Sequence, residues 1–68
     1  MKPRPLNAKQ LRALRRVRGT SLGVKEVNGI RRATYRVLFD RGLIEWDPYG
    51  AHVELTYAGS QTLEREKP

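Results

Sequence analysis

The sequence predicts a small α+β domain, and three features in its second half carry that prediction. An amphipathic helical segment ends at Gly42 and runs directly into a strand. A proline-containing turn at 47–50 then leads into a second strand, and Thr56 is placed to cap a last helix. With 68 residues the chain forms at most one domain, whose stability should be marginal.

A first helix is expected at Ala8–Arg18. Asn7 is a good N-cap residue, and Gln10 three residues later completes a capping box. Leu6 can pack over the first turn as a hydrophobic staple. The apolar stripe of this helix consists of Leu11, Leu14 and Val17, with Ala8 at its edge. Gly19 is expected to end the helix.

The segment after Gly19 gives the weakest pattern. A second helix has room only at Leu22–Val27, where Gly23 and two β-branched valines lower helix propensity. We expect a single turn or an irregular loop there. Asn28 is a candidate cap for the helix that follows.

That following helix is expected to run from Gly29 or Ile30 to Arg41, with Gly42 as a left-handed C-cap. Its predicted buried face consists of Ile30, Ala33, Thr34, Val37 and Leu38. Its predicted exposed face consists of Arg32, Tyr35, Arg36 and Phe39, with Arg31 at the border.

Strands are expected at Leu43–Asp47 and Ala51–Leu55. Asp, Pro and Gly at the first, second and fourth positions of 47–50 fit a type I turn. Alternation places Val53 and Leu55 inward and His52 and Glu54 outward. The last helix is expected at Tyr57–Glu66, capped by Thr56 and anchored by Ala58 and Leu63.

The net charge of +7 is unevenly distributed along the chain. Residues 1–42 carry twelve lysines and arginines against two acidic residues, whereas residues 43–68 have a net charge of −3. Ten of the fourteen basic residues are arginine, which favours contacts with phosphates and base edges. This asymmetry favours a nucleic-acid partner over the alternative, a solvated basic surface.

Several other classes of function find no support in the composition. Cysteine is absent and His52 is the single histidine, so neither a disulfide nor the usual zinc site is expected. No apolar run has the length of a membrane span, and the N-terminus lacks an apolar signal core. No catalytic constellation or phosphate-binding glycine loop is visible, so we expect no enzyme and no cofactor. A bacterial cytoplasm or nucleoid is the expected location.

Two sequence segments resemble the wing region of winged helix regulators. Residues 34–45, TYRVLFDRGLIE, resemble the end of a bacterial or phage recognition helix, and residues 55–63, LTYAGSQTL, resemble the segment after the wing in MarR-like and PadR-like proteins. The resemblance covers about 30 residues and is more specific for fold than for function. It implies a small winged helix: three helices, the second of them short, plus a two-stranded β-hairpin wing. The absent flanking helices fit a small phage or mobile-element protein better than a full-size regulator.

The prolines and cations at the start of the chain predict an extended basic arm, 1–6, with a disordered tail as the alternative. The resemblance assigns 7–68 to a winged helix domain. It implies that helix 30–41 enters the major groove of double-stranded DNA. The base-reading candidates are Arg31, Arg32, Tyr35 and Arg36; arginine can bind guanine O6 and N7, and tyrosine can reach phosphate or a thymine methyl. The backbone-contact candidates are Lys9, Arg12, Arg16 and Lys25. For both sets the alternative is a solvated basic helix face.

Tyr49 at the wing tip, with His52, is a candidate contact to phosphate or the minor groove, although Asp47 and Glu54 disfavour it. The expected role is transcriptional regulation or an architectural part in recombination. Because one copy offers few phosphate contacts, useful affinity is expected to need a homodimer or cooperative neighbours.

Phe39 is the anomaly of this prediction, because it falls on the same face as the arginines. It either packs on Trp46 or the first helix, or forms a contact with a protein partner. The second option defines an alternative function, a winged helix module that binds and modulates a host protein. Binding to structured RNA is a third option with the same charge pattern.

Overall fold

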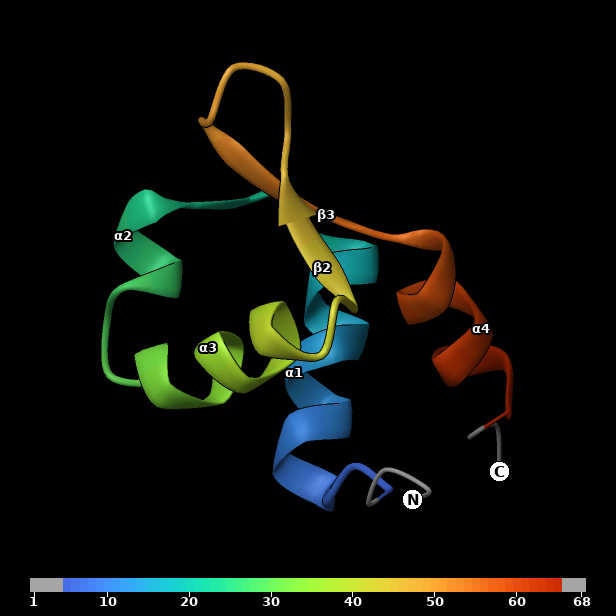
Figure 1. Ribbon diagram of the computed structural model, residues 1–68. Coiled ribbons are helices and arrows are strands. Elements are labelled where there is room, and N and C mark those ends of the chain that lie inside the picture. The colour runs from blue at the N-terminus through green and yellow to red at the C-terminus, as the bar shows by residue number, and fades with distance from the viewer. Residues whose placement is uncertain (1–4, 66–68) are drawn as a thin grey trace.

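The computed structural model describes residues 5–65, which form four helices and a three-stranded antiparallel sheet (Figure 1). The elements in chain order are α1 Ala8–Gly19, β1 Leu22–Gly23, α2 Val24–Val27, α3 Arg32–Asp40, β2 Ile44–Trp46, β3 His52–Leu55 and α4 Tyr57–Arg65. The predicted α+β class is therefore confirmed, whereas the count of three helices implied by the resemblance was wrong.

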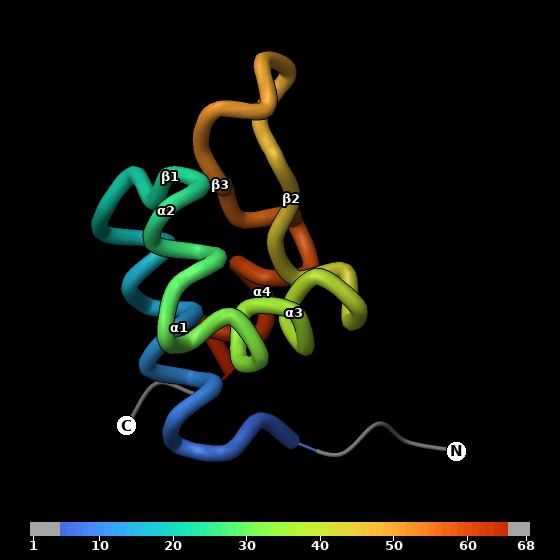
Figure 2. Tube along the Cα trace, turned by 90° about the vertical axis from the view of Figure 1, so that its left-hand side faces the viewer, coloured from blue at the N-terminus to red at the C-terminus, as the bar shows by residue number. Residues whose placement is uncertain are grey.

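The sheet has one strand more than the sequence predicted. Its order is β1-β3-β2, and Leu22 of β1 pairs with Val53 of β3 (Figure 2). Leu22 is 1% exposed, so the residue that pairs with β3 is also buried in the core. Residues 22–27, expected to form a single turn or an irregular loop, are a two-residue strand followed by the single helical turn α2. The Glu26 carboxylate accepts a hydrogen bond from the Gly23 N–H at 3.0 Å and stabilises that turn.

Helix α1 begins as predicted. The Gln10 N–H donates to Asn7 Oδ1 at 2.8 Å, and the Asn7 N–H donates to Gln10 Oε1 at 3.1 Å, so both halves of the capping box form. The buried residues of α1 are Ala13, Leu14 and Val17, with Leu11 half-buried and Ala8 exposed. Gly19 is the last helical residue rather than a left-handed stop, and the Thr20 N–H closes the helix on the Arg16 carbonyl at 2.9 Å.

Helix α3 is shorter than predicted, and its buried face is only partly the predicted one. Leu38 is buried and Thr34 and Val37 are half-buried as expected, but Tyr35 takes the place of Ile30 and Ala33 in the core. Tyr35 and Leu38 are 3% and 0% exposed, whereas Ile30 lies outside the helix and is fully exposed. The predicted core position Ala33 is exposed as well. Asn28 caps the end of α2 and does not begin α3. The N-cap residue of α3 is Arg31, which forms no side-chain capping hydrogen bond. The large tyrosine ring offers more apolar area to the core than an alanine methyl, and this decides the orientation of the helix.

The turn from α3 into β2 has the predicted glycine geometry. Gly42 has φ +71°, and its N–H donates to the Phe39 carbonyl at 2.9 Å. The Leu43 N–H donates to the Leu38 carbonyl at 3.0 Å, which completes a Schellman motif. The chain therefore reverses within two residues and sends Leu43 and Ile44 into the core.

The hairpin β2–β3 is confirmed with slightly shorter strands, and it projects beyond the helices (Figure 1). Val53 is buried and Leu55 half-buried, while His52 and Glu54 are exposed, as alternation predicted. The Gly50 N–H donates to the Asp47 carbonyl at 2.9 Å and closes the turn.

Helix α4 docks through Thr56 and a glycine. Thr56 Oγ1 accepts from the Gly59 N–H at 3.0 Å and donates to the Gly42 carbonyl at 2.6 Å, so the predicted cap also fastens α4 to the α3–β2 turn. The anchors of α4 are Gly59 and Leu63, both buried, and the prediction of Ala58, which is exposed, was wrong. Glu66, the predicted last residue of this helix, lies outside the described residues.

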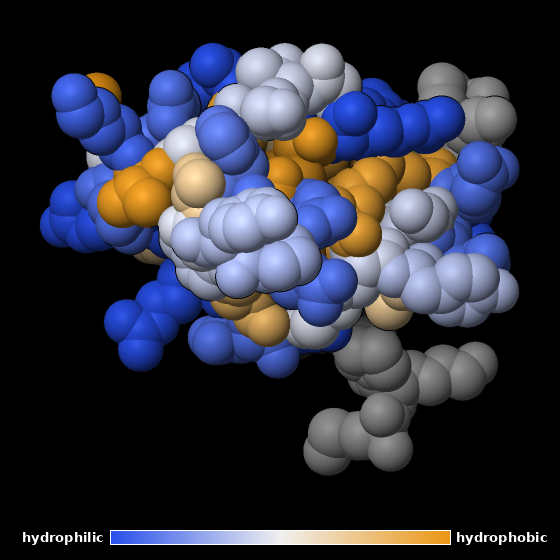
Figure 3. All heavy atoms as spheres, turned by 90° about the horizontal axis from the view of Figure 1, so that it is seen from above, coloured by the Kyte–Doolittle hydropathy of each residue, from blue (hydrophilic) through white to orange (hydrophobic). Residues whose placement is uncertain are grey.

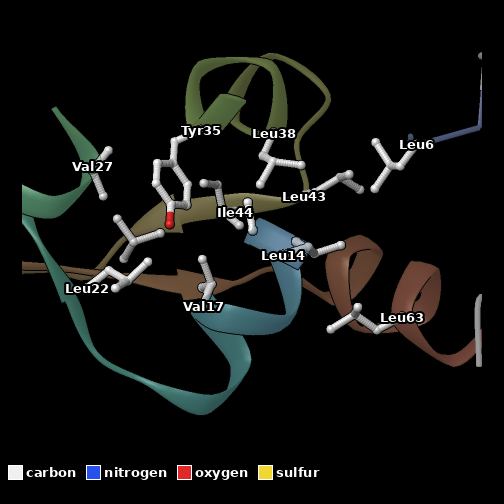
Figure 4. Close-up of a cluster of buried hydrophobic side chains, with 12 residues drawn as sticks. Leu6, Leu14, Val17, Leu22, Val27, Tyr35, Leu38, Leu43, Ile44 and Leu63 are labelled. Atoms are coloured by element: carbon white, nitrogen blue, oxygen red, sulfur yellow. The ribbon is translucent and has the colours of Figure 1, made fainter. Parts of the chain in front are cut away.

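One apolar cluster joins all the major elements (Figure 4). Its buried members are Leu6, Ala13, Leu14, Val17, Leu22, Val27, Tyr35, Leu38, Leu43, Ile44, Val53 and Leu63. Leu6 was assigned to the arm, but its burial makes it part of the folded domain. The rest of the predicted arm is Pro5, which is exposed, and residues outside the described range.

Candidate nucleic-acid interface

The outward face of α3 carries two of the predicted recognition residues. Arg32 and Arg36 are exposed, one helical turn apart, with the exposed Ala33 between them. Asp40, exposed at the last position of α3, is the acidic residue of the helix. The positive charge of this face therefore lies in its N-terminal part.

A hollow of about 420 Å³ opens beside these arginines, between α3, the end of α2 and β2. Its lining residues are Val27, Asn28, Arg32, Ala33, Arg36, Phe39 and Trp46. We call it the β2-side hollow. Figure 3, which looks down on the molecule from above, shows apolar areas recessed among hydrophilic side chains.

Phe39 and Trp46 form the aromatic part of this hollow. Their rings stack at a centroid distance of 5.6 Å with an interplanar angle of 24°, and both are half-buried against the core. Packing of Phe39 on Trp46, one of the two options left open by the sequence, is therefore confirmed. The stack accounts for an aromatic residue beside the arginines without invoking a protein partner.

The other predicted cations surround the opposite side of the turn into α3. Two neighbouring hollows of about 410 and 440 Å³ share Arg16 and Arg31, and we call them the α1-side hollows. Their other basic lining residues are Lys9, Arg12, Arg15 and Lys25. The structure thus brings the four predicted backbone-contact residues together with Arg31. Arg15 belongs to the same surface, and its i+3 spacing from Arg12 on the helix could have signalled it.

These cations have no acidic partners in the part of the chain that the structure describes. Within residues 5–65, none of the basic residues that line the three hollows forms a salt bridge. The one carboxylate lining a hollow, that of Glu26, is engaged by the Gly23 amide. The surface around the start of α3 is therefore uncompensated positive charge.

Tyr35 lines one of the α1-side hollows but is not part of the exposed basic face. Its ring points into the apolar cluster beside Leu38 and is only 3% exposed (Figure 4). The prediction that Tyr35 shares the exposed face of Arg32 and Arg36 was wrong, because the helix rotates its largest apolar side chain toward the core. Tyr35 is consequently a core residue.

The tip of the β2–β3 hairpin exposes one aromatic side chain. Tyr49 is 92% exposed and follows Pro48 in the turn, where Gly50 adopts φ +67°. Tyr49 lines none of the three hollows around α3. It is thus separate from the basic surface and available as a contact at the far end of the hairpin.

Asp47 organises the turn between β2 and β3. Its carboxylate accepts from the Ala51 N–H at 2.9 Å and lies 3.8 Å from His52 Nδ1. The hydrogen bond from Ala51 is the main cause that lowers the pKa of Asp47 below its ordinary value, and His52 adds to it. The ionised carboxylate therefore stabilises the folded turn.

The lowered pKa of Asp47 predicts an acid-dependent loss of stability. Its contribution is fully present above the ordinary pKa of an aspartate and disappears as pH falls through the lowered value. The stability gap between wild type and Asp47→Asn, measured by urea unfolding, should therefore narrow between about pH 7 and about pH 3. Glu54→Gln, at an exposed position without a partner within residues 5–65, is the control. An equal Asp47→Asn gap at both pH values would contradict the assignment.

Two searches over residues 5–65 concern other kinds of site. None of the helices in this range is long and apolar enough to cross a membrane. No group of three or more His, Asp or Glu side chains in the same range is placed to hold a metal ion.

Comparison with known proteins returned no relative: no protein-family model matches the chain, and neither does any curated protein or solved structure.

Proposed function

We propose that the protein is a winged helix that binds double-stranded DNA, with α3 in the major groove. The element order supports this proposal: helix, strand, two helices, and a hairpin whose second strand pairs with the first strand of the chain. The two helices α2 and α3 supply the helix-turn-helix, and β2–β3 supplies the wing. The extra strand β1 fits this arrangement because it ties the start of α2 to the hairpin.

The observation that carries the proposal is the uncompensated charge at the start of α3. Arg31, Arg32 and Arg36 are all exposed, and within residues 5–65 none of them has an acidic partner. Several guanidinium groups held close together repel one another. The negative charge of a bound polyanion offsets this repulsion, and the release of its counterions favours binding. Arginine also matches phosphate oxygens and the O6/N7 edge of guanine in a bidentate way.

The hollows lie on both sides of the start of α3, which is the arrangement that the proposed complex with B-form DNA requires. The major groove is about 12 Å wide, admits one helix and is bordered by a phosphate backbone on each side. The start of α3 stands between the β2-side hollow and the α1-side hollows. In the proposed complex one backbone lies along Lys9, Arg12 and Arg16, and the other lies toward Arg36 and the wing.

The protein-interaction alternative loses its main argument, because Phe39 is occupied by its stack on Trp46. The RNA alternative keeps the same charges but meets a different groove. An A-form duplex has a deep, narrow major groove that a helix does not enter. Duplex DNA is therefore the preferred partner, in a regulatory role or an architectural one.

A salt titration tests the proposal. Binding of the purified protein to a fluorescent random-sequence DNA duplex should be detectable at low salt and should weaken as salt rises. Three phosphate contacts give a slope of about −2.7 in log K against log salt, or a loss of about 40-fold between about 50 and about 200 mM. We expect this slope or a steeper one.

The same titration separates the alternatives. A duplex RNA of the same sequence should bind more weakly than the DNA. Undetectable binding to DNA at low salt, or an affinity that does not depend on salt, would refute the DNA proposal. Tighter binding to the RNA duplex than to the DNA duplex would favour RNA as the partner.

A further inference from the structure

Ile30 is an exposed aliphatic side chain in the middle of the basic surface. Its side chain is 101% exposed, whereas periodicity predicted it to be buried. It lies between Gly29 and Arg31 and lines an α1-side hollow together with Arg16 and Lys25. An isoleucine in this position leaves apolar surface in water, where it is unfavourable.

The backbone around Ile30 holds the side chain outward. The Arg32 N–H donates to the Gly29 carbonyl at 3.1 Å, and the Tyr35 N–H donates to the Arg31 carbonyl at 3.2 Å. Tyr35 is in turn buried in the core. Hydrogen bonds on both sides of Ile30 thus tie the turn to α3, and the outward position belongs to the fold.

Ala33 is a second exposed apolar residue at the same end of α3. It lines the β2-side hollow next to Arg32 and Arg36. Ile30 and Ala33 therefore place apolar groups on the two sides of the turn into α3, and arginines flank both. A polyanion with small apolar groups on its surface complements this pattern.

We propose that Ile30, assisted by Ala33, contacts thymine methyl groups in the major groove and gives the protein a preference for thymine at these positions. The inference rests on the proposed DNA-binding function. The C5-methyl of thymine is the apolar group that the major-groove edge of a base pair presents, and aliphatic side chains contact it. The neighbouring arginines hold the backbone or guanines, so the aliphatic residues supply the discrimination that charge alone does not.

The experiment removes the methyl group and nothing else. A preferred duplex is enriched from a random pool with the wild-type protein, and all of its thymines are then replaced by deoxyuridine. One lost methyl contact of about 0.8 kcal/mol corresponds to about a fourfold weaker Kd. We expect at least this loss for the wild type.

Two variants assign the effect to the residue. Ile30→Ala should bind the thymine and deoxyuridine duplexes with nearly equal affinity and should unfold like the wild type, because the side chain is fully exposed. Val24→Ala removes another exposed aliphatic side chain, from α2, and should keep the wild-type preference for thymine.

The outcomes separate this inference from the proposed function. Salt-dependent binding with equal affinity for both duplexes, or with no sequence enriched from the pool, overturns the thymine contact and leaves DNA binding intact. An unchanged thymine preference in Ile30→Ala also overturns it. Failure to bind any duplex at low salt refutes the proposed function itself.

Discussion

Replacing Gly59 by alanine should remove most of the free energy of unfolding of the protein. A Cβ at this position would collide with the carbonyl oxygen of Leu43, and it would come within 3.2 Å of a methyl of Leu55. The Leu43 carbonyl is backbone and also accepts the Thr56 N–H at 3.1 Å, so it has little freedom to move away. Helix α4 would have to shift off the α3–β2 turn and expose Leu63.

The expected cost is about 3 kcal/mol, at the upper end of overpacking. A core of this size rarely supplies more than about 3–5 kcal/mol, so the remaining stability would be close to zero. Urea unfolding followed by far-UV circular dichroism measures the change.

Gly19→Ala is the matched control for Gly59→Ala. It adds the same methyl group in a helical position where nothing lies within 4 Å, and its φ is not positive. We expect its urea midpoint to stay the same or to rise. The free energy of unfolding should increase by at most about 1 kcal/mol. Equal midpoints for Gly59→Ala and wild type would contradict the close approach of α4 to Leu43.

The double substitution Arg32→Ala with Arg36→Ala should weaken binding to duplex DNA by about 2 kcal/mol or more, which is about 30-fold. Both guanidinium groups lie on the outward face of α3 and line the β2-side hollow. Alanine is the strongest helix former, so α3 should keep its structure. If one of the two arginines contacts phosphate, the slope of log K against log salt should also fall by about 1. Fluorescence anisotropy at several salt concentrations measures both changes.

The control for this pair removes the same charge elsewhere. Arg18 and Arg65 are exposed in the last turns of α1 and α4, and neither lines a hollow beside α3. Arg18→Ala with Arg65→Ala should lower affinity only through the reduced net charge, by a few-fold at most at moderate salt. An equal loss for both double variants would mean that net charge, not the face of α3, determines binding.

Phe39 illustrates how the structure changes the design of such tests. If Phe39 were fully exposed, its replacement by alanine would test a protein partner without affecting the fold. Because its ring stacks on Trp46 and packs against the core, Phe39→Ala would also disturb the fold. Loss of binding in that variant would not identify a partner, whereas Arg32 and Arg36 can be changed without touching the core.

The sequence by itself determined the features that depend on neighbours a few residues away. The capping box of Asn7 and Gln10, the left-handed C-cap at Gly42 and the closed turn at 47–50 all formed as predicted. Each depends on the backbone preference or hydrogen bonds of residues within five positions of each other, so the local residue types suffice.

Only the tertiary structure decided which side of α3 meets the core. Periodicity divides α3 into faces, but the burial of Tyr35 and the exposure of Ile30 depend on how the helix packs against α1 and the sheet. The strand at Leu22 exists because β3 pairs with it, and Gly59 is required because Leu43 approaches it. These contacts join residues 16 or more positions apart in the chain, and their energy arises from packing that no local pattern contains. The candidate site follows the same division: its arginines are visible in the sequence, and their grouping around the start of α3 is a property of the fold.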